Sequence, residues 1–158
     1  MMFVTFRPLL ALGLSAALLL PVTAQAADPE DAIEYRQSAL RVMAWQLGPL
    51  GAMAQGDIDY DADVFAAKTD NLAAVAHLPW EGFMEGTLRG DDHAAETDAL
   101  AAIADNWDDF EERQTTFQQE AGTLAQLVQD DAEFADLRRQ VGAVANSCKG
   151  CHDEYRAD

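Results

Sequence analysis

The final segment of the chain combines a helical repeat of apolar side chains with both cysteines of the sequence. Apolar residues recur there every three or four positions, at Phe134, Leu137, Val141, Val144, Cys148, Cys151 and Tyr155. This spacing predicts an amphipathic helix whose buried face carries the two thiols. Positions 148, 151 and 152 share one helix face, so His152 lies beside both sulfurs. A group that binds all three side chains must therefore lie inside the fold.

The five residues from Cys148 to His152 have the form Cys-x-x-Cys-His, which is the attachment pattern of a c-type haem. Two thiols can add to the vinyl groups of one porphyrin while the adjacent imidazole reaches its iron. A redox dithiol usually opens a helix, where the dipole lowers the thiol pKa, whereas this pair lies at a predicted helix C-terminus. A zinc site needs about four ligands, and the only other histidines are His77 and His93. A disulfide would leave His152 unexplained, so we predict one covalent haem c.

The first 26 residues have the features of a cleaved signal peptide. Arg7 precedes an apolar run from Leu9 to Leu20, and Ala24-Gln25-Ala26 has the small-x-small form of a signal peptidase site. The apolar run is too short to span a bilayer as a stable helix. Cleavage after Ala26 would leave 158 − 26 = 132 residues, enough for one domain. We therefore predict a periplasmic protein of residues 27–158 that carries no membrane anchor after cleavage.

The charge of the chain narrows its partners. Ten Lys and Arg face 28 Asp and Glu, for a net charge of −18, and removal of the leader with Arg7 gives 9 − 28 = −19. This excess of acid excludes nucleic acid as a partner. The acids are spread along the chain, which is typical of a solvated exterior. A basic redox partner protein remains compatible with this charge.

Four amphipathic segments predict an all-α fold. The first runs from about Asp31 to Ala54 after Pro29, the second from Asp61 or Ala62 to Leu78, and the third from about Glu96 to Val128. The fourth follows a predicted N-cap at Asp130 or Asp131 and contains the cysteine motif. A non-periodic stretch over residues 79–94 is expected to form an ordered crossover. We predict an antiparallel up-and-down four-helix bundle with a covalently bound internal haem.

Two further features bear on the cofactor. Arg36 lies on the apolar seam of the first segment, where its burial is costly unless an anion such as a haem propionate meets it. The alternative is that Arg36 reaches solvent at the edge of the seam. Trp80 or Phe83 of the crossover could cover a haem edge, or could anchor the crossover to the bundle.

The chain resembles the class II c-type cytochromes, and specifically the cytochrome c' family. The resemblance covers nearly all of residues 28–158 and is carried by the stretch from Glu30 to Leu40, by Leu78-Pro79-Trp80, and by the stretch from Cys148 to Arg156. It implies that His152 is the proximal iron ligand, that Arg36 and Arg156 lie near the haem, and that Leu40 stands over the iron on the distal side. Many members have an Ile-Trp pair where this chain has Ile103-Ala104. The resemblance also implies a homodimer through the first two helices, where Ala44, Trp45, Ala66, Ala73 and Ala74 could form the contact.

The expected function depends on whether the sixth coordination position of the haem iron carries a protein ligand. Leu40 offers no lone pair, so the iron is expected to be five-coordinate, high-spin and open to small uncharged gases. Nitric oxide and carbon monoxide are the expected ligands, and the family resemblance implies nitric oxide capture or protection, with electron exchange as a further role. The alternative is a six-coordinate electron-transfer cytochrome with Met43 on the iron, Met53 and Met84 being weaker candidates. We expect no enzyme activity, because a peroxidase needs a distal base and only His77 or His93 could supply one.

Overall fold

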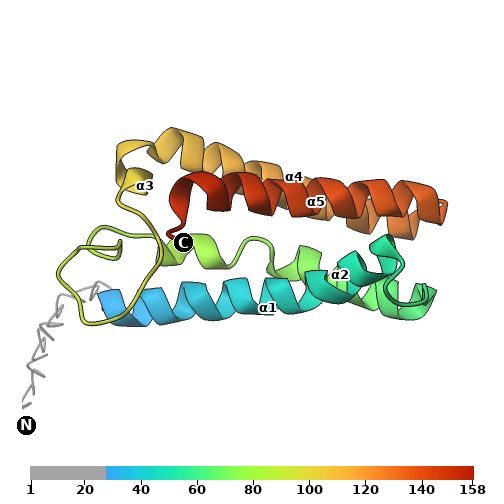
Figure 1. Ribbon diagram of the computed structural model, residues 1–158, viewed down its shortest axis with the longest axis horizontal. Coiled ribbons are helices and arrows are strands. Elements are labelled where there is room, and N and C mark those ends of the chain that lie inside the picture. The colour runs from blue at the N-terminus through green and yellow to red at the C-terminus, as the bar shows by residue number, and fades with distance from the viewer. Residues whose placement is uncertain (1–27) are drawn as a thin grey trace, which may run out of the picture.

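The computed structural model describes residues 28–158, so the predicted signal peptide and its cleavage site lie outside the described residues. Figure 1 shows four long helices, α1 (Pro29–Gln55), α2 (Ala62–Val75), α4 (Trp107–Gln129) and α5 (Phe134–Tyr155), with two short ones, η1 (Pro79–Gly82) and α3 (Ala102–Asp105). Successive long helices run in opposite directions. Helix α1 packs against α2 and α5, and α4 packs against the same two helices. This confirms the predicted four-helix bundle.

The helix ends follow local side-chain chemistry. Asp28 Oδ1 accepts a hydrogen bond from the Glu30 amide at 2.9 Å, directly before Pro29 at the start of α1. Asp61 Oδ1 accepts one from the Val64 amide at 3.0 Å at the start of α2. Helix α1 ends at Gln55, and the capping residue that follows, Gly56, has a φ of 83° in the left-handed region. Helix α2 ends three residues before the predicted Leu78 because the chain turns there toward Pro79.

Two predicted boundaries were wrong. Helix α5 is preceded by Glu133, whose side chain caps nothing, whereas Asp130 ends α4 and Asp131 occupies the turn with a φ of 51°. The predicted third helix from Glu96 begins only with α3, and a break at Asn106 separates α3 from α4. Backbone groups before α3 bond elsewhere: Ala99 O accepts from the Arg89 amide at 2.7 Å, and Asp98 O from the Ala157 amide at 2.8 Å. A helix would need these groups for its own hydrogen bonds.

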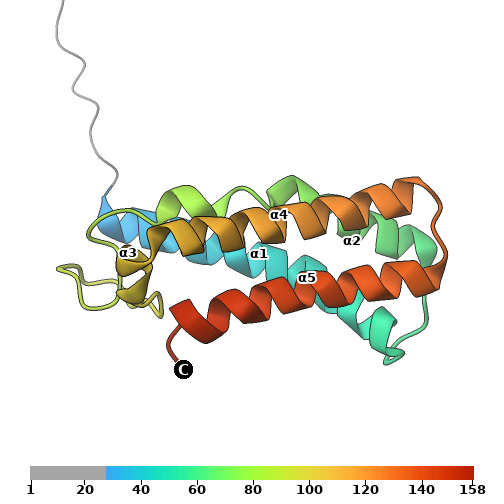
Figure 2. The same cartoon turned by 90° about the horizontal axis from the view of Figure 1, so that it is seen from above.

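The predicted crossover over residues 79–94 begins with η1. The segment from Phe83 to Ala101, which contains the rest of it and is called the crossover from here on, lies at one end of the bundle. Figure 2 shows it with α3 at the end where α1 begins and α5 finishes. The crossover pairs with the end of the chain through an isolated antiparallel bridge between Ala99 and Arg156, and the Leu100 amide donates to Tyr155 O at 2.9 Å. It is therefore attached to the turn of α5 that follows the cysteine motif.

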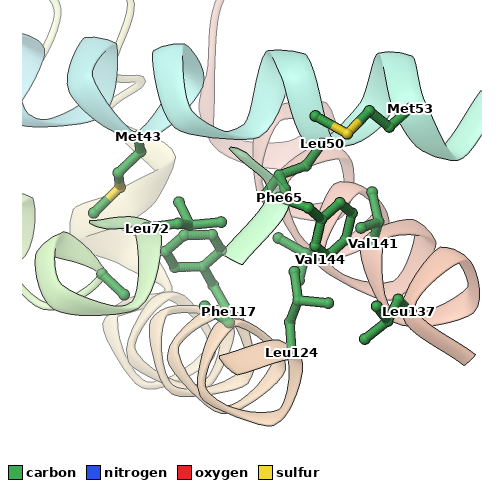
Figure 3. Packing of buried hydrophobic residues seen from close by; sticks show 12 residues of the cluster. Met43, Leu50, Met53, Phe65, Leu72, Phe117, Leu124, Leu137, Val141 and Val144 are labelled. Atoms are coloured by element: carbon green, nitrogen blue, oxygen red, sulfur yellow. The ribbon is translucent and has the colours of Figure 1, made fainter. Parts of the chain in front are cut away.

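The apolar core has two parts. Figure 3 shows the larger, which fills the bundle interior and includes Met43, Leu50, Phe65, Leu72, Phe117, Leu124, Leu137, Val141 and Val144. The smaller, at the crossover end, consists of Leu88, Ile103, Phe110 and Tyr155. Cys148 packs against the larger part and Cys151 against the smaller, so the two sulfurs lie where the parts meet. Among residues 28–158, no helix is long and apolar enough to cross a membrane.

Candidate functional site

A cavity of about 730 Å³ lies at the junction of the two core parts, within the size range of ligand and cofactor sites. Residues of α1, α2, η1, the crossover, α3, α4 and α5, together with Arg156, form its wall. All of the residues predicted for the site line this cavity, namely Arg36, Leu40, Phe83, Cys148, Cys151, His152 and Arg156. The fold thus brings together residues from positions 36 to 156.

The α5 wall of the cavity carries the cysteine motif. Cys148 and Cys151 are free thiols and partly buried. Burial raises the pKa of Cys148, and burial raises the pKa of Cys151 to about 11, so both are protonated at neutral pH. Burial, with the positive charge of Arg156, lowers the pKa of His152. The imidazole is therefore in the neutral form that binds metals.

These properties fit a c-type haem. Two neighbouring thiols and a neutral imidazole lie on one wall, and the rest of the cavity is mostly apolar. The redox-dithiol alternative fits poorly, because burial disfavours the thiolate that such chemistry requires. Cys148, Cys151 and His152 would hold the group, and the apolar walls would enclose its ring.

The α1 wall presents two apolar side chains, Leu40 and Met43, to the same cavity. Met43 is buried in the larger core part and lies beside Leu72 of α2 (Figure 3). Leu40 is only partly buried and packs at the edge of that core. The packing thus makes Met43 a core residue and leaves Leu40 at the cavity surface.

Arg36 is 1% exposed, so its side chain does not reach solvent at the edge of the seam. Its Nη1 donates to Gly82 O at 2.9 Å and to Thr87 Oγ1 at 2.7 Å. Its Nη2 donates to Thr87 O at 2.5 Å and to Thr97 Oγ1 at 2.8 Å. These acceptors are neutral, and burial lowers the pKa of Arg36 to about 10. Arg36 remains charged at neutral pH and fastens the crossover to α1.

Aromatic side chains complete this end of the cavity. The Arg36 guanidinium carbon lies 4.5 Å from the ring centroid of Phe83, a cation–π distance. Phe83 meets Phe110 of α4 edge to face, with the centroids 4.9 Å apart. Trp80 Nε1 donates to Ala76 O at 2.8 Å, which attaches η1 to the end of α2. Both aromatics line the cavity and also anchor the chain around it.

Sequence reasoning missed three contributors to the site. Thr87 is fully buried, and its hydroxyl also accepts from the Met84 amide at 3.2 Å and donates to Met84 O at 2.7 Å. Thr97 supplies a further acceptor for Arg36. Arg113 of α4 lines the cavity and pairs with Asp109 at 2.6 Å. Their signals were weak, because threonines in a loop and an i,i+4 charge pair are both common on surfaces.

Comparison with known proteins gives a consistent result. Residues 31–156 match the sequence profile of the family described as cytochrome c'. The chain is 74% identical over 132 residues to cytochrome c' of Halomonas halodenitrificans, a match that covers 84% of this chain and 100% of that protein. The structure of cytochrome c prime from Shewanella frigidimarina superposes with a TM-score of 0.76 at 38% identity, covering 85% of this chain and 100% of that one.

A third similar protein was solved with a ligand. It is the nitric oxide complex of a leucine-to-alanine variant of cytochrome c prime from Alcaligenes xylosoxidans, with a TM-score of 0.73 and 34% identity. The match covers 85% of this chain and 99% of that chain. The similarity therefore extends over the whole bundle and includes the end that contains the cavity.

Proposed function

The chain belongs to the cytochrome c' family and carries a c-type haem, and we propose from this premise that it is a periplasmic binding protein for nitric oxide and carbon monoxide. Cys148 and Cys151 attach the haem, and His152 binds its iron from the α5 side. The haem supplies an iron that takes up a small ligand on its remaining free side. The chain determines which ligands can reach that side.

The observation that carries this proposal is the pair of apolar side chains, Leu40 and Met43, that α1 presents to the cavity. Leu40 and Met43 both line the cavity, but Leu40 has no lone pair and Met43 is buried in the larger core part. With Leu40 rather than a ligating side chain facing it, an iron held by His152 would be five-coordinate and high-spin. A small uncharged ligand that displaces this alkyl group would be favoured, and an aliphatic side chain offers bound dioxygen no hydrogen-bond donor. The nitric oxide complex of the Alcaligenes xylosoxidans variant supports this ligand class.

Spectroscopy of the mature ferric protein tests the proposal against its main alternative. We expect a high-spin ferric signal at neutral pH and saturable changes in the ferrous absorption spectrum on addition of nitric oxide or carbon monoxide. The substitution Leu40→Ala should speed carbon monoxide binding, whereas Met43→Leu, the matched control, should leave the spin state unchanged. A low-spin protein that becomes high-spin in Met43→Leu would instead identify a six-coordinate His/Met electron-transfer cytochrome.

We also propose that the protein binds gases and exchanges electrons without catalysing a reaction of its own. A peroxidase needs a base on the ligand side, and among residues 28–158 neither His77 nor His93 lines the cavity. His77 is exposed at the end of α2, and His93 Nε2 lies 3.0 Å from Leu88 O in the crossover. Turnover of peroxide faster than that of free haem would contradict this proposal.

The periplasmic location rests on the leader and on the chemistry of attachment. The Halomonas protein matches this chain over 132 residues, which is the length left by cleavage after Ala26. Mass spectrometry of the mature protein should give the mass of residues 27–158 plus one haem. A mature protein that retains residues 1–26 would refute the predicted processing.

A homodimer through α1 and α2 is the proposed assembly. Trp45 on α1 is 74% exposed, and Val42 and Val64 add exposed apolar area on the same two helices. Exposed apolar side chains of this kind favour burial against a second copy. Sedimentation equilibrium should give a dimer that Trp45→Glu converts to a monomer. A monomeric parent protein at micromolar concentration would refute the assembly.

A further inference from the structure

A charged cluster joins α4 to the cysteine motif outside the residues assigned above. Arg113 Nη1 donates to the carbonyl oxygen of Gly150 at 2.6 Å, and Arg113 Nε donates to Asp109 Oδ2 at 2.6 Å. The Tyr155 hydroxyl donates to the same Asp109 oxygen at 2.5 Å. The Arg113 guanidinium also lies 5.6 Å from the ring centroid of Tyr155. Helix α4 thus holds α5 at two points.

The two contacts on α5 bracket Cys151 and His152. Gly150 directly precedes Cys151, and Tyr155 follows His152 by three positions. Tyr155 is buried and meets Phe110 of α4 edge to face, with the centroids 5.4 Å apart. A carbonyl fixed on one side and a buried ring fixed on the other leave this turn of α5 little freedom to rotate about its axis. The direction of the His152 imidazole follows from that rotation.

Arg113 also brings a positive charge to the cavity. Its side chain lines the cavity wall, and among residues 28–158 its Nη2 makes no hydrogen bond. By contrast, both terminal nitrogens of Arg36 are already bonded to the crossover. Arg113 is therefore a cation of α4 in direct contact with the backbone of the motif.

We propose that Arg113 is a positioning residue for the iron-binding imidazole of His152 and that its charge favours the reduced iron. This inference rests on the proposed ligation by His152. The Asp109 carboxylate holds the guanidinium against the Gly150 carbonyl, so the orientation of the motif is set from α4. Oxidised iron carries one more positive charge than reduced iron, so a fixed cation beside the cavity raises the reduction potential.

The test uses the mature holoprotein in its Arg113→Gln form, with Arg139→Gln as the matched control. Arg139 is also on a bundle helix and also pairs with an aspartate, Asp136, but it does not line the cavity. We expect Arg113→Gln to lower the reduction potential and to shift the iron–imidazole stretching band in the resonance Raman spectrum of the ferrous protein. Arg139→Gln should change neither. Unchanged band and potential in Arg113→Gln would overturn the proposal.

Two further variants separate orientation from charge and remain informative if Arg113→Gln fails to mature. Arg113→Lys keeps the charge, so the reduction potential of this variant should stay near that of the parent. A reduction potential as low as that of Arg113→Gln would refute the charge effect. Asp109→Asn releases the guanidinium and removes a negative charge, so the band should shift while the potential rises; no change in either would overturn the proposal. A parent protein without an iron–imidazole band would refute the proposed ligation by His152 itself, which is a separate outcome.

Discussion

Replacement of Arg36 by methionine should destabilise the protein by about 3 kcal/mol. The substitution keeps a long side chain but leaves Gly82 O and Thr87 O without their guanidinium donor, whereas Thr97 Oγ1 still accepts from the Ala99 amide. A buried acceptor without a donor costs roughly 1–3 kcal/mol, so these two cost about 4 kcal/mol, and loss of the desolvated cation–π contact with Phe83 costs about 2 kcal/mol more. The variant no longer buries a charge, and the fall of the Arg36 pKa from its ordinary value to about 10 makes that relief roughly 3 kcal/mol. The difference is the expected loss.

The assay is urea unfolding of the holoprotein at neutral pH, followed by far-ultraviolet circular dichroism. Hydrogen exchange at the Thr87 amide, which donates to Met84 O at 3.2 Å, should also become faster in Arg36→Met. Arg41→Met is the control, because Arg41 is exposed on the same helix and also lines the cavity. Its free energy of unfolding should change by no more than about 0.5 kcal/mol. The reasoning fails if Arg36→Met costs less than about 1 kcal/mol or no more than Arg41→Met.

Two other substitutions test the surroundings of the cavity. A Cβ at Gly82 would lie 2.7 Å from Ala32 O, so Gly82→Ala should lower the free energy of unfolding in urea by about 1–3 kcal/mol. The control is Gly142→Ala, which should be neutral or stabilising because a Cβ there would have nothing within 4 Å. Equal effects of the two substitutions would contradict the close approach at Gly82. Hydrogen bonds from Arg113 and Tyr155 hold the pKa of Asp109 in the folded protein below its ordinary value of 3.8. As the pH falls, the Asp109 carboxylate is therefore protonated in the unfolded chain before it is protonated in the folded protein. Asp109→Asn should therefore have a lower free energy of unfolding than the parent at pH 7, and the difference between the two proteins should narrow below pH 3.8. A difference that does not depend on pH would refute the stabilising role of the Asp109 carboxylate.

The helices and the haem-binding segment could be predicted because their signals are local. The apolar repeat that ends in Cys148, Cys151 and Tyr155 specifies one helix face, and α5 buries that face in both parts of the core. The start of the third helix was predicted wrongly because it depends on contacts with residues that are distant in the sequence. Leu100, Ile103 and Trp107 have helical spacing, but Asp98 O and Ala99 O bond to residues distant in the sequence. Single-segment periodicity contains no information about such tertiary hydrogen bonds.

The environment of Arg36 shows the same limit at the site. Its place on an apolar seam indicated burial, and the structure has it 1% exposed. The sequence suggested a haem propionate as its partner, and the structure adds the carbonyl and hydroxyl oxygens of residues 82, 87 and 97, which the sequence did not indicate. Nothing in the pattern of the crossover distinguishes a threonine that binds an arginine from one that faces solvent. Such polar partners are visible only once the fold brings positions 36 and 87 together.

The pairing of the crossover with residues 156 and 157 has a consequence for the order of assembly. Arg36 reaches Thr97 across 61 positions, and the Ala157 amide reaches Asp98 from almost the last residue of the chain. Contacts between such distant positions carry a high loop-closure cost and depend on prior docking of the helices. The cavity therefore closes only once the last residues of the chain are available to pair with the crossover. Until then Cys148 and Cys151 stay open to the covalent attachment of a haem.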